Sequence, residues 1–436
     1  MINWFSNRLA DRLPFFYGFV IIPIAMMMQV CTSPGQTFAV SAFTPSLRES
    51  LKLSDSRLSL AYMLGTMLAA LPLSFIGPLS DRWGIRKVTI IVAVALSLTC
   101  AMASRVNGFA SLLFVFFLLR FLGQGSLSLL GSNAIAMWYR SRIGRVSAAM
   151  SIGGAIAFAW VPEWLEMAID GYGWRQTYQG LAIIVAALLL PVMVLLFRNR
   201  PEEVGQNVDG LSINKPSSAW PNQSHMTRVA QKPEVSWSLR QAIHHPSIHI
   251  LGWVQCFWAL TGTGVVFYLF TLCDDRGLPD GVAADLFKTL GLSMLAMQLI
   301  GGVLADWLPL NRMLSVGTLM LAIGLGFAWQ GNSPWQMHTF AAFFGAGQGL
   351  SLAVGAVVWV RYYGRQHLGS IRGAVLCLTV AGSGCGPLIM GVMRDYYDVF
   401  DPAIGLFFAL MLVLSVLAWW ATPPVQDYAA RTKSPA

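Results

Sequence analysis

One basic side chain lies far inside a long apolar stretch of this 436-residue sequence. Arg120 is about eleven residues into the stretch 109–138, which corresponds to roughly 16 Å along an α-helix. A charge near the middle of a membrane costs about 2.5–3.5 kcal/mol on insertion scales, so such a residue faces protein or water and usually belongs to a functional site. Arg120 can therefore hold an anionic substrate or form a conformational ion pair. The alternative, that it bonds only to backbone carbonyls and glutamines of neighbouring helices, is equally compatible with the sequence.

Polar side chains form stripes on several other apolar stretches. Gln29, Thr32 and Gln36 are spaced by three and four residues, which places them on one face of a helix. Pro34 and Gly35 interrupt that stripe and predict a local loosening of the helix. Such stripes either line a cavity or bond to a neighbouring helix, at roughly 0.6 kcal/mol per bond, and we favour the cavity. The residues expected to contact a substrate are Arg120, Gln29, Thr32, Gln36, Gln124, Gln255, Trp258, Gln298 and Gln348.

A charged connector, residues 77–87, joins two apolar stretches. Asp81 falls at the C-terminal end of the first stretch, where the helix dipole disfavours an acid unless a basic residue or another helix N-terminus satisfies it. Gly77, four residues earlier, would let that other helix approach closely. Gly302 and Asp306 repeat the same spacing 225 residues later. The predicted conformational latch comprises Gly77, Asp81, Arg82, Gly84, Arg86 and Lys87 in its first copy, and Gly302 and Asp306 in its second.

The other reactive residues do not indicate an enzyme. The six cysteines lie mostly inside apolar stretches, the histidines have no ligand spacing, and the sequence contains no phosphate-binding loop. We therefore expect no catalytic residues, no metal and no cofactor. Charged residues near the ends of apolar stretches either form a gate or are solvated interfacial charges. They are Glu163, Glu166, Asp170, Arg175, Arg394, Asp395 and Asp398.

Composition places the chain in a membrane. Hydrophobic residues make up 56% of it and charged residues 11%, whereas soluble domains carry about 25% charged residues. Long apolar segments in lipid must be helical, so we predict an all-α integral membrane protein with twelve transmembrane helices. The predicted spans are 17–42, 57–80, 88–104, 109–138, 146–169, 175–197, 247–272, 283–305, 312–330, 336–360, 371–393 and 402–421. The net charge of +9 is spread over short connectors, which indicates anionic lipid and not nucleic acid as its counterpart.

The spans are organised as two similar halves. Gly123-Gln124-Gly125 recurs as Gly347-Gln348-Gly349, at an offset of 224 residues. We predict an N-terminal six-helix bundle at 1–198, a cytoplasmic linker with an interfacial helix at 199–245, and a C-terminal six-helix bundle at 246–436. Of the 29 Lys and Arg residues, 20 fall on the side of the two termini and eight on the other. Both termini are therefore expected in the cytoplasm, in a multi-pass protein of the cell membrane, or of the inner membrane in a Gram-negative cell.

The connector resembles the signature of a known family. Gly77-x-Leu79-Ser80-Asp81-Arg82-x-Gly84-x-Arg86-Lys87 is similar to the segment between helices 2 and 3 of the major facilitator superfamily. The resemblance implies two pseudo-symmetric bundles that expose a central site to each side in turn, with helices 1, 4, 7 and 10 around it. Many members carry Arg-x-x-Gln-Gly on helix 4. This chain has Arg120-Phe-Leu-Gly-Gln124-Gly125, which is one residue longer.

Further segments resemble the monocarboxylate transporters and oxalate–formate antiporters. They are residues 18–43, residues 361–373 and Gly384-Cys-Gly386-Pro387. Those families place a substrate-binding arginine on helix 8, at about the position of Gln298 here. The resemblance implies secondary active or facilitative transport of a small organic anion such as a monocarboxylate, by a monomer in the lipid bilayer, with a proton or counter-substrate as a coupling partner. The alternatives are an exporter of drugs or amphipathic metabolites and a membrane sensor that does not transport.

Overall fold

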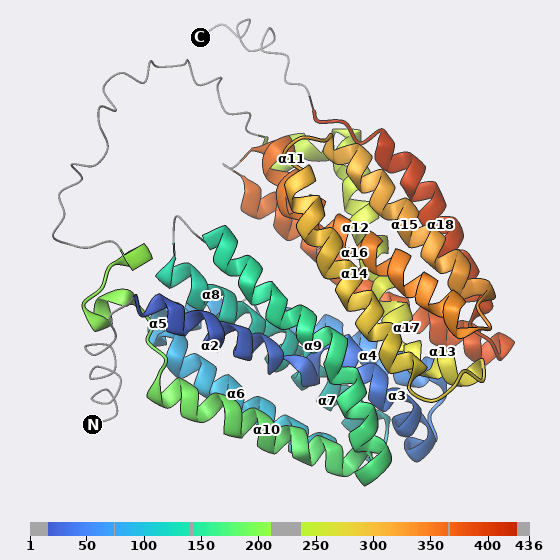
Figure 1. Ribbon diagram of the computed structural model, residues 1–436, viewed down its shortest axis with the longest axis horizontal. Helices are drawn as coiled ribbons and strands as arrows, with labels where there is room; N and C mark the ends of the chain where they lie inside the picture. The colour runs from blue at the N-terminus through green and yellow to red at the C-terminus, as the bar shows by residue number, and fades with distance from the viewer. Residues whose placement is uncertain (1–15, 74, 140–142, 211–236, 365–366, 425–436) are drawn as a thin grey trace, which may run out of the picture. The chain divides into compact units, whose positions relative to one another are not determined.

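The computed structural model describes residues 16–73, 75–139, 143–210, 237–364 and 367–424 (Figure 1). Within these ranges all regular secondary structure is helical, and no strand is present. These ranges contain twelve helical stretches, some made of several consecutive segments, that are long and apolar enough to cross a membrane. The predictions of an all-α fold and of twelve spans are therefore confirmed.

The first six spans are built from ten helical segments. They are α2 (Gly18–Val30), η1 (Ser33–Gly35), α3 (Thr37–Leu51), α4 (Asp55–Leu73), α6 (Ile85–Ala103), α7 (Phe109–Leu119), η2 (Arg120–Leu127), α8 (Ser128–Trp138), α9 (Ile143–Tyr172) and α10 (Trp174–Leu195). The short α5 (Ile76–Trp83) precedes α6, and the 3-10 turns η3 (Pro201–Val204) and η4 (Val208–Gly210) follow α10.

The second six spans follow α11 (Leu239–Ile243), which begins with a capping box between Ser238 and Gln241. The remaining segments are α12 (Pro246–Phe267), α13 (Leu269–Asp275), α14 (Val282–Leu304), α15 (Leu310–Gln330), α16 (Pro334–Tyr363), α17 (Leu368–Tyr397) and α18 (Asp401–Trp419).

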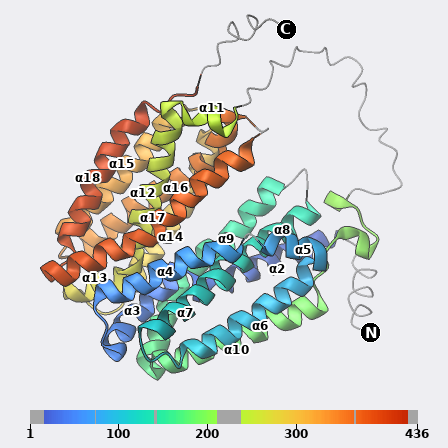
Figure 2. The same cartoon turned by 180° about the vertical axis from the view of Figure 1, so that it is seen from behind.

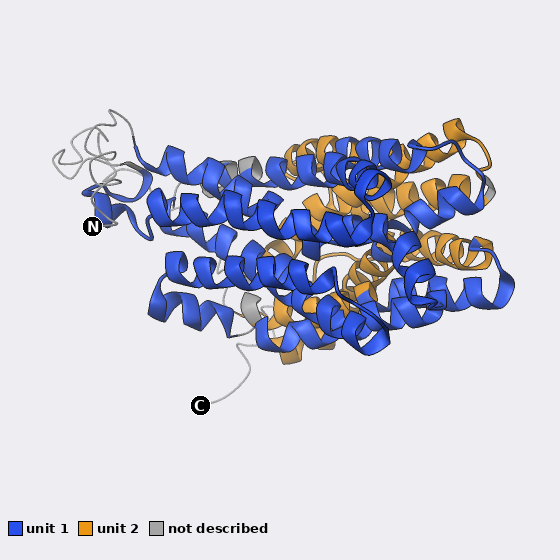
Figure 3. Ribbon diagram, turned by 90° about the horizontal axis from the view of Figure 1, so that it is seen from below, with its two compact units in different colours: residues 1–219, 263–292, 384–400 blue, residues 220–262, 293–383, 401–436 orange. Residues whose placement is uncertain are grey.

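The chain forms two compact units, which are coloured separately in Figure 3. Unit 1 comprises residues 1–219, 263–292 and 384–400, and unit 2 comprises residues 220–262, 293–383 and 401–436. Unit 1 thus contains the first six spans together with α13, the start of α14 and the end of α17. The two units are defined by which residues lie close together in space, whereas the predicted domain boundaries at 198 and 245 come from the sequence repeat. Those boundaries therefore remain a prediction.

Small residues bring the helices of each unit close together. In unit 1, α6 runs along α10, and α4 runs along α7 (Figures 1 and 2). In unit 2, α15 packs against both α16 and α18. A Cβ atom at Gly347 would lie 2.6 Å from the carbonyl oxygen of Gly317, so the backbones of α15 and α16 are in contact there. Close approach through glycine is typical of helix packing in membranes, where van der Waals contact stabilises association.

Three of the spans are interrupted. The first breaks at η1, as Pro34 and Gly35 predicted, and the chain is extended at Gln36 before α3 begins. The fourth contains the π-helical segment η2, in which the Ser126 hydroxyl donates to the carbonyl of Phe121, five residues earlier. The seventh breaks at Tyr268, between α12 and α13. Interrupted helices and π-bulges commonly occur at functional sites, because they leave backbone groups free to bind other partners.

Candidate functional site

The breaks in the first and fourth spans lie against each other in unit 1. A Cβ atom at Gly35 would lie 2.1 Å from the carbonyl oxygen of Leu119, and one at Gly123 would lie 3.1 Å from the Cα atom of Gly35. Only glycine allows the two backbones to meet at these positions. The interruption of one helix therefore packs directly on the π-helical segment of the other, and both lie beside Arg120.

Arg120 is buried at this crossing, with 5% of its surface exposed. Its Nη1 donates to the carbonyl of Gly35 at 3.2 Å and lies 3.5 Å from the hydroxyl of Thr37. The guanidinium carbon is 5.0 Å from the ring centroid of Tyr62, in a cation–π arrangement. Nε has no hydrogen-bond partner, and no carboxylate of the described residues pairs with Arg120. The guanidinium thus has a backbone acceptor and an aromatic face, but no neutralising charge.

The other predicted residues of unit 1 differ in their freedom to bind a ligand. Thr32 is buried, and its hydroxyl donates to the carbonyl of Gln29 and accepts from Nε2 of Gln36. Its hydrogen bonds therefore stabilise the break in the first span. Gln29 packs beside Gly154 of α9. Gln124, four residues after Arg120 in η2, has a buried Oε1 without a partner. Of these residues, Gln36 and Gln124 are the nearest to Arg120 along the chain or its contacts. Gln36 directly follows Gly35, which binds Arg120, and Gln124 lies in the same π-helical segment η2 as Arg120.

Unit 2 brings its predicted residues together between α12 and α16. A Cβ atom at Gly262 would lie 2.5 Å from Nε2 of Gln348, and one at Gly355 would lie 3.3 Å from Oε1 of Gln255. Nε2 of Gln348 and Nε1 of Trp258 are buried donors without partners in the described structure. Gln298 of α14 is the last of the predicted substrate-binding residues, and its backbone nitrogen packs against Gly349. Unpartnered buried polar groups are costly, so these donors suit a bound polar molecule.

The two copies of the predicted latch are arranged differently. In unit 2, Nη2 of Arg361 pairs with Asp306 at 2.6 Å, and its Nη1 donates to the carbonyl of Ala305. In unit 1, Asp81 is exposed at the end of α5. Arg86 instead donates to the carbonyls of Met193 and Val194 at the C-terminal end of α10. The positive charge of Arg86 therefore stabilises the C-terminal end of α10, where the helix dipole is negative.

Among the remaining latch residues, Gly84 forms the turn between α5 and α6. Gly84 has φ +84°, a conformation that favours glycine, and lies against the side chain of Asn199. Arg82 and Lys87 are exposed. A Cβ atom at Gly77 or Gly302 would meet no described atom within 4 Å. The latch therefore remains a prediction, with an ion pair present in its second copy.

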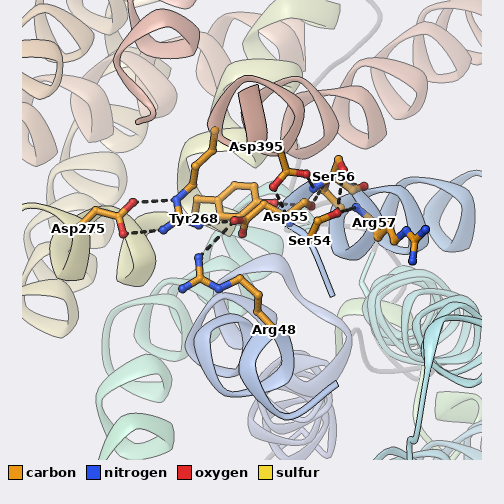
Figure 4. Close-up of polar contacts among 10 residues, drawn as sticks. Arg48, Ser54, Asp55, Ser56, Arg57, Tyr268, Asp275 and Asp395 are labelled. Atoms are coloured by element: carbon orange, nitrogen blue, oxygen red, sulfur yellow. Dashed lines mark hydrogen bonds and ion pairs between the residues drawn. The ribbon is translucent and has the colours of Figure 1, made fainter. Parts of the chain in front are cut away.

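A second polar site, which we call the Asp55 cluster, lies in unit 1 (Figure 4). It consists of Arg48, Asp55, Tyr268, Asp275, Arg394 and Asp395. Oδ2 of Asp55 accepts from Arg48 at 3.2 Å and also from Arg394. Arg394 in turn donates to both carboxylate oxygens of Asp275, at 2.8 and 2.7 Å. Only 4% of the Asp55 side chain is exposed, so its charge depends on these partners.

The cluster ties together the ends of α3, α4, α13 and α17. The carboxylate of Asp395 accepts from the backbone N–H groups of Asp55 and Ser56, at 3.0 and 2.9 Å, where the dipole of α4 favours an anion. The hydroxyl of Tyr268 donates to the carbonyl of Asp55 at 2.9 Å.

A smaller ion-pair site joins α9 to α14 in unit 1. Nζ of Lys288 lies 2.7 Å from Glu163 and 3.0 Å from Asp285. The rings of Phe158 and Phe287, on the same two helices, pack edge to face at 5.5 Å. The sequence left open whether such residues are solvated charges or form a gate. Arg394, Asp395 and Glu163 are paired across helices, as a gate would require, while about a third of the Glu163 side chain still reaches solvent. The choice between a gate and solvated interfacial charges therefore stays a prediction. Asp170 is exposed, and Arg175 packs on Trp174.

Comparisons with known proteins agree with this architecture. The family model for the Major Facilitator Superfamily matches residues 25–313 and 282–435. Among curated proteins, the chain is 21% identical over 299 residues to the uncharacterized MFS-type transporter YhjX of Escherichia coli (strain K12), which covers 67% of each chain.

Solved structures share the fold at low sequence identity. A bacterial homolog of the human lysosomal transporter Spinster superposes with a TM-score of 0.69 at 13% identity, covering 93% of this chain and 96% of that one. The nucleoside transporter NupG gives 0.67 at 14%, covering 93% and 99%, and a D-xylose–proton symporter gives 0.68 at 16%, covering 93% and 98%. With twelve spans and a family match along most of its length, the chain belongs to the Major Facilitator Superfamily.

Proposed function

We propose that this transporter moves a small organic anion by alternating access, with Arg120 as the group that binds it. The observation that carries the proposal is the buried guanidinium without a carboxylate partner among the described residues. An uncompensated buried charge is strongly unfavourable, and an anionic ligand would supply the missing charge. The fork of guanidinium donors also matches the two oxygens of a carboxylate.

The surroundings of Arg120 favour a binding role over a purely structural one. The carbonyl of Gly35 occupies Nη1, while the ring of Tyr62 covers one face of the guanidinium. These contacts orient the group without neutralising it. Gln36, which follows Gly35, and Gln124, in the same π-helical segment as Arg120, are the further predicted substrate contacts nearby. Gln255, Trp258, Gln298 and Gln348 remain predicted contacts from the second half. A monocarboxylate is the substrate class that the sequence resemblance suggests, coupled to a proton or a counter-substrate.

A neutral polar solute is the second candidate. The unpartnered donors of Gln348 and Trp258 in unit 2 would suit a hydroxylated molecule. The fold is shared with proteins named as a nucleoside transporter and a xylose symporter. In this case Arg120 would serve the packing of the first and fourth spans.

Thermal stabilisation of the purified protein by candidate solutes distinguishes the two. A ligand present at 100 times its dissociation constant stabilises the folded state by about 2.7 kcal/mol. We expect stabilisation by one of the carboxylates acetate, lactate, oxalate or benzoate, and its loss in Arg120→Gln. The matched control is Arg105→Gln, which removes the same charge at an exposed position. Stabilisation by xylose or uridine alone, retained in Arg120→Gln, would overturn the anion proposal and favour the neutral solute.

A further inference from the structure

Two adjacent aromatic residues at the break of the seventh span point to different sites. The ring of Phe267, the last residue of α12, lies 4.7 Å from the ring of Tyr62. Tyr268, the residue at the break, donates its hydroxyl to the carbonyl of Asp55. One short stretch of backbone therefore contacts the neighbourhood of Arg120 on one side and the Asp55 cluster on the other.

Tyr62 connects Phe267 to the binding group. It is fully buried in α4, and its ring lies under the guanidinium of Arg120. Its hydroxyl shares a hydrogen bond of 2.7 Å with the hydroxyl of Thr37. The ring is also held edge to face by Phe116, at 5.6 Å. A change in the position of Arg120 must therefore move the ring of Tyr62 or lose the contact with it.

Tyr268 has little room to move independently of the Asp55 cluster. A Cβ atom at Gly391 of α17 would lie 2.7 Å from the hydroxyl of Tyr268 and 2.7 Å from the carbonyl oxygen of Asp55. The ring of Tyr268 packs on Phe400 at 4.9 Å, and the guanidinium of Arg394 lies over the same Phe400 ring. Close-packed interiors transmit displacement because they contain few voids that could absorb it.

We propose that Tyr62, Phe267 and Tyr268 form an aromatic relay that couples the occupancy of Arg120 to the opening of the Asp55 cluster. The inference rests on the proposed anion site at Arg120 and extends it. An anion that draws the guanidinium away from Tyr62 loosens Phe267, and Tyr268 then releases the carbonyl of Asp55. Because such coupling is reciprocal, opening of the cluster also changes the affinity of Arg120 for its ligand.

A native cysteine, Cys273, can be used to detect opening of the Asp55 cluster in ligand-free protein. Cys273 lies in α13, two residues before Asp275, with 3% of its surface exposed. A thiol reagent cannot reach the buried sulfur while α13 stays packed. Release of α13 would expose the thiol to the reagent. The labelling rate of Cys273 by a thiol reagent, read by mass spectrometry of its peptide, therefore measures opening of the cluster.

The experiment compares labelling rates in ligand-free protein. Arg120→Gln and Phe267→Leu should each raise the Cys273 rate by about 2- to 30-fold, the range of a buried cation–π contact. Combined, they should raise it no further than the larger single effect, because they break the same path. Tyr62→Phe keeps the ring and should stay within about 2-fold of wild type. Phe257→Leu, the same substitution in the same helix, is the matched control, since Phe257 stacks on Trp253 instead.

Several results would overturn the relay. They are an unchanged Cys273 rate in Arg120→Gln, full additivity with Phe267→Leu, or a large effect of Tyr62→Phe. Asp55→Asn must itself raise the rate, and failure to do so would show that the cluster does not hold α13. None of these outcomes depends on a ligand. The relay can therefore fail while carboxylate stabilisation survives. Conversely, if no carboxylate stabilises the protein but the Cys273 rates change as expected, the packing path from Arg120 to the Asp55 cluster survives and its control by an anion does not.

Discussion

Removal of charges from the two ion-pair sites of unit 1 should destabilise the protein in a fixed order. Arg394→Gln should cost most, Asp55→Asn less, and Lys288→Gln least. The order follows from what each substitution leaves behind. Without Arg394, the carboxylate of Asp275 loses both of its hydrogen bonds and Asp55 keeps only Arg48.

The magnitudes follow from burial. Removal of one partner of a buried ion pair costs about 3–5 kcal/mol, and Arg394→Gln belongs in this range because its side chain is only 16% exposed. Asp55→Asn should cost less, about 1–3 kcal/mol, since Arg394 retains Asp275 and Arg48 reaches solvent. Lys288 and Glu163 are each about a third exposed, so their bridge is worth about 0–1 kcal/mol.

The assay is thermal unfolding of the detergent-purified variants at one heating rate and one salt concentration. High salt should reduce the destabilisation caused by Lys288→Gln and leave that caused by Arg394→Gln nearly unchanged, because salt screens buried ion pairs less than exposed ones. The control is Arg57→Gln, which removes an exposed arginine close to the cluster. A loss for Lys288→Gln as large as that for Arg394→Gln, or stabilisation by Asp55→Asn, would refute the reasoning.

Two further outcomes are expected. Gly35→Ala should destabilise the protein by about 1–3 kcal/mol or more, because its Cβ would overlap the carbonyl of Leu119, whereas Gly77→Ala, with open space, should unfold like the wild type. Asp81→Ala should reduce solute uptake into proteoliposomes without reducing the amount of folded protein. Unaltered uptake would contradict the latch prediction.

The spans could be predicted from sequence because each is a local property. Apolar length and scarce charge define a helix in lipid, and Pro34 with Gly35 is sufficient to indicate the break in the first span. Arg120 was identifiable for the same reason, since a single charge stands out against an apolar background.

The Asp55 cluster could not be predicted in this way. Asp55 pairs with Arg394 across 339 residues, and each of them alone looks like an interfacial charge at a helix end. The one local signal, Ser54-Asp55-Ser56 before an apolar run, indicates only a helix start. Tyr62 was missed as well, because an aromatic residue in an apolar helix is ordinarily a packing residue. Its role follows from Arg120 and Phe267, which come from other spans.

The π-helical segment gives the fourth span a tolerance that a regular helix lacks. An inserted residue rotates everything downstream by about 100° around an α-helix. Here the residue by which Arg120-Phe-Leu-Gly-Gln124-Gly125 exceeds the family pattern falls inside η2, whose wider turns absorb it. As a result α7 still packs on α4, and α8 still packs on α2. A lineage could therefore lengthen the chain beside Arg120, the proposed ligand-binding residue, without changing how the other helices of the bundle pack.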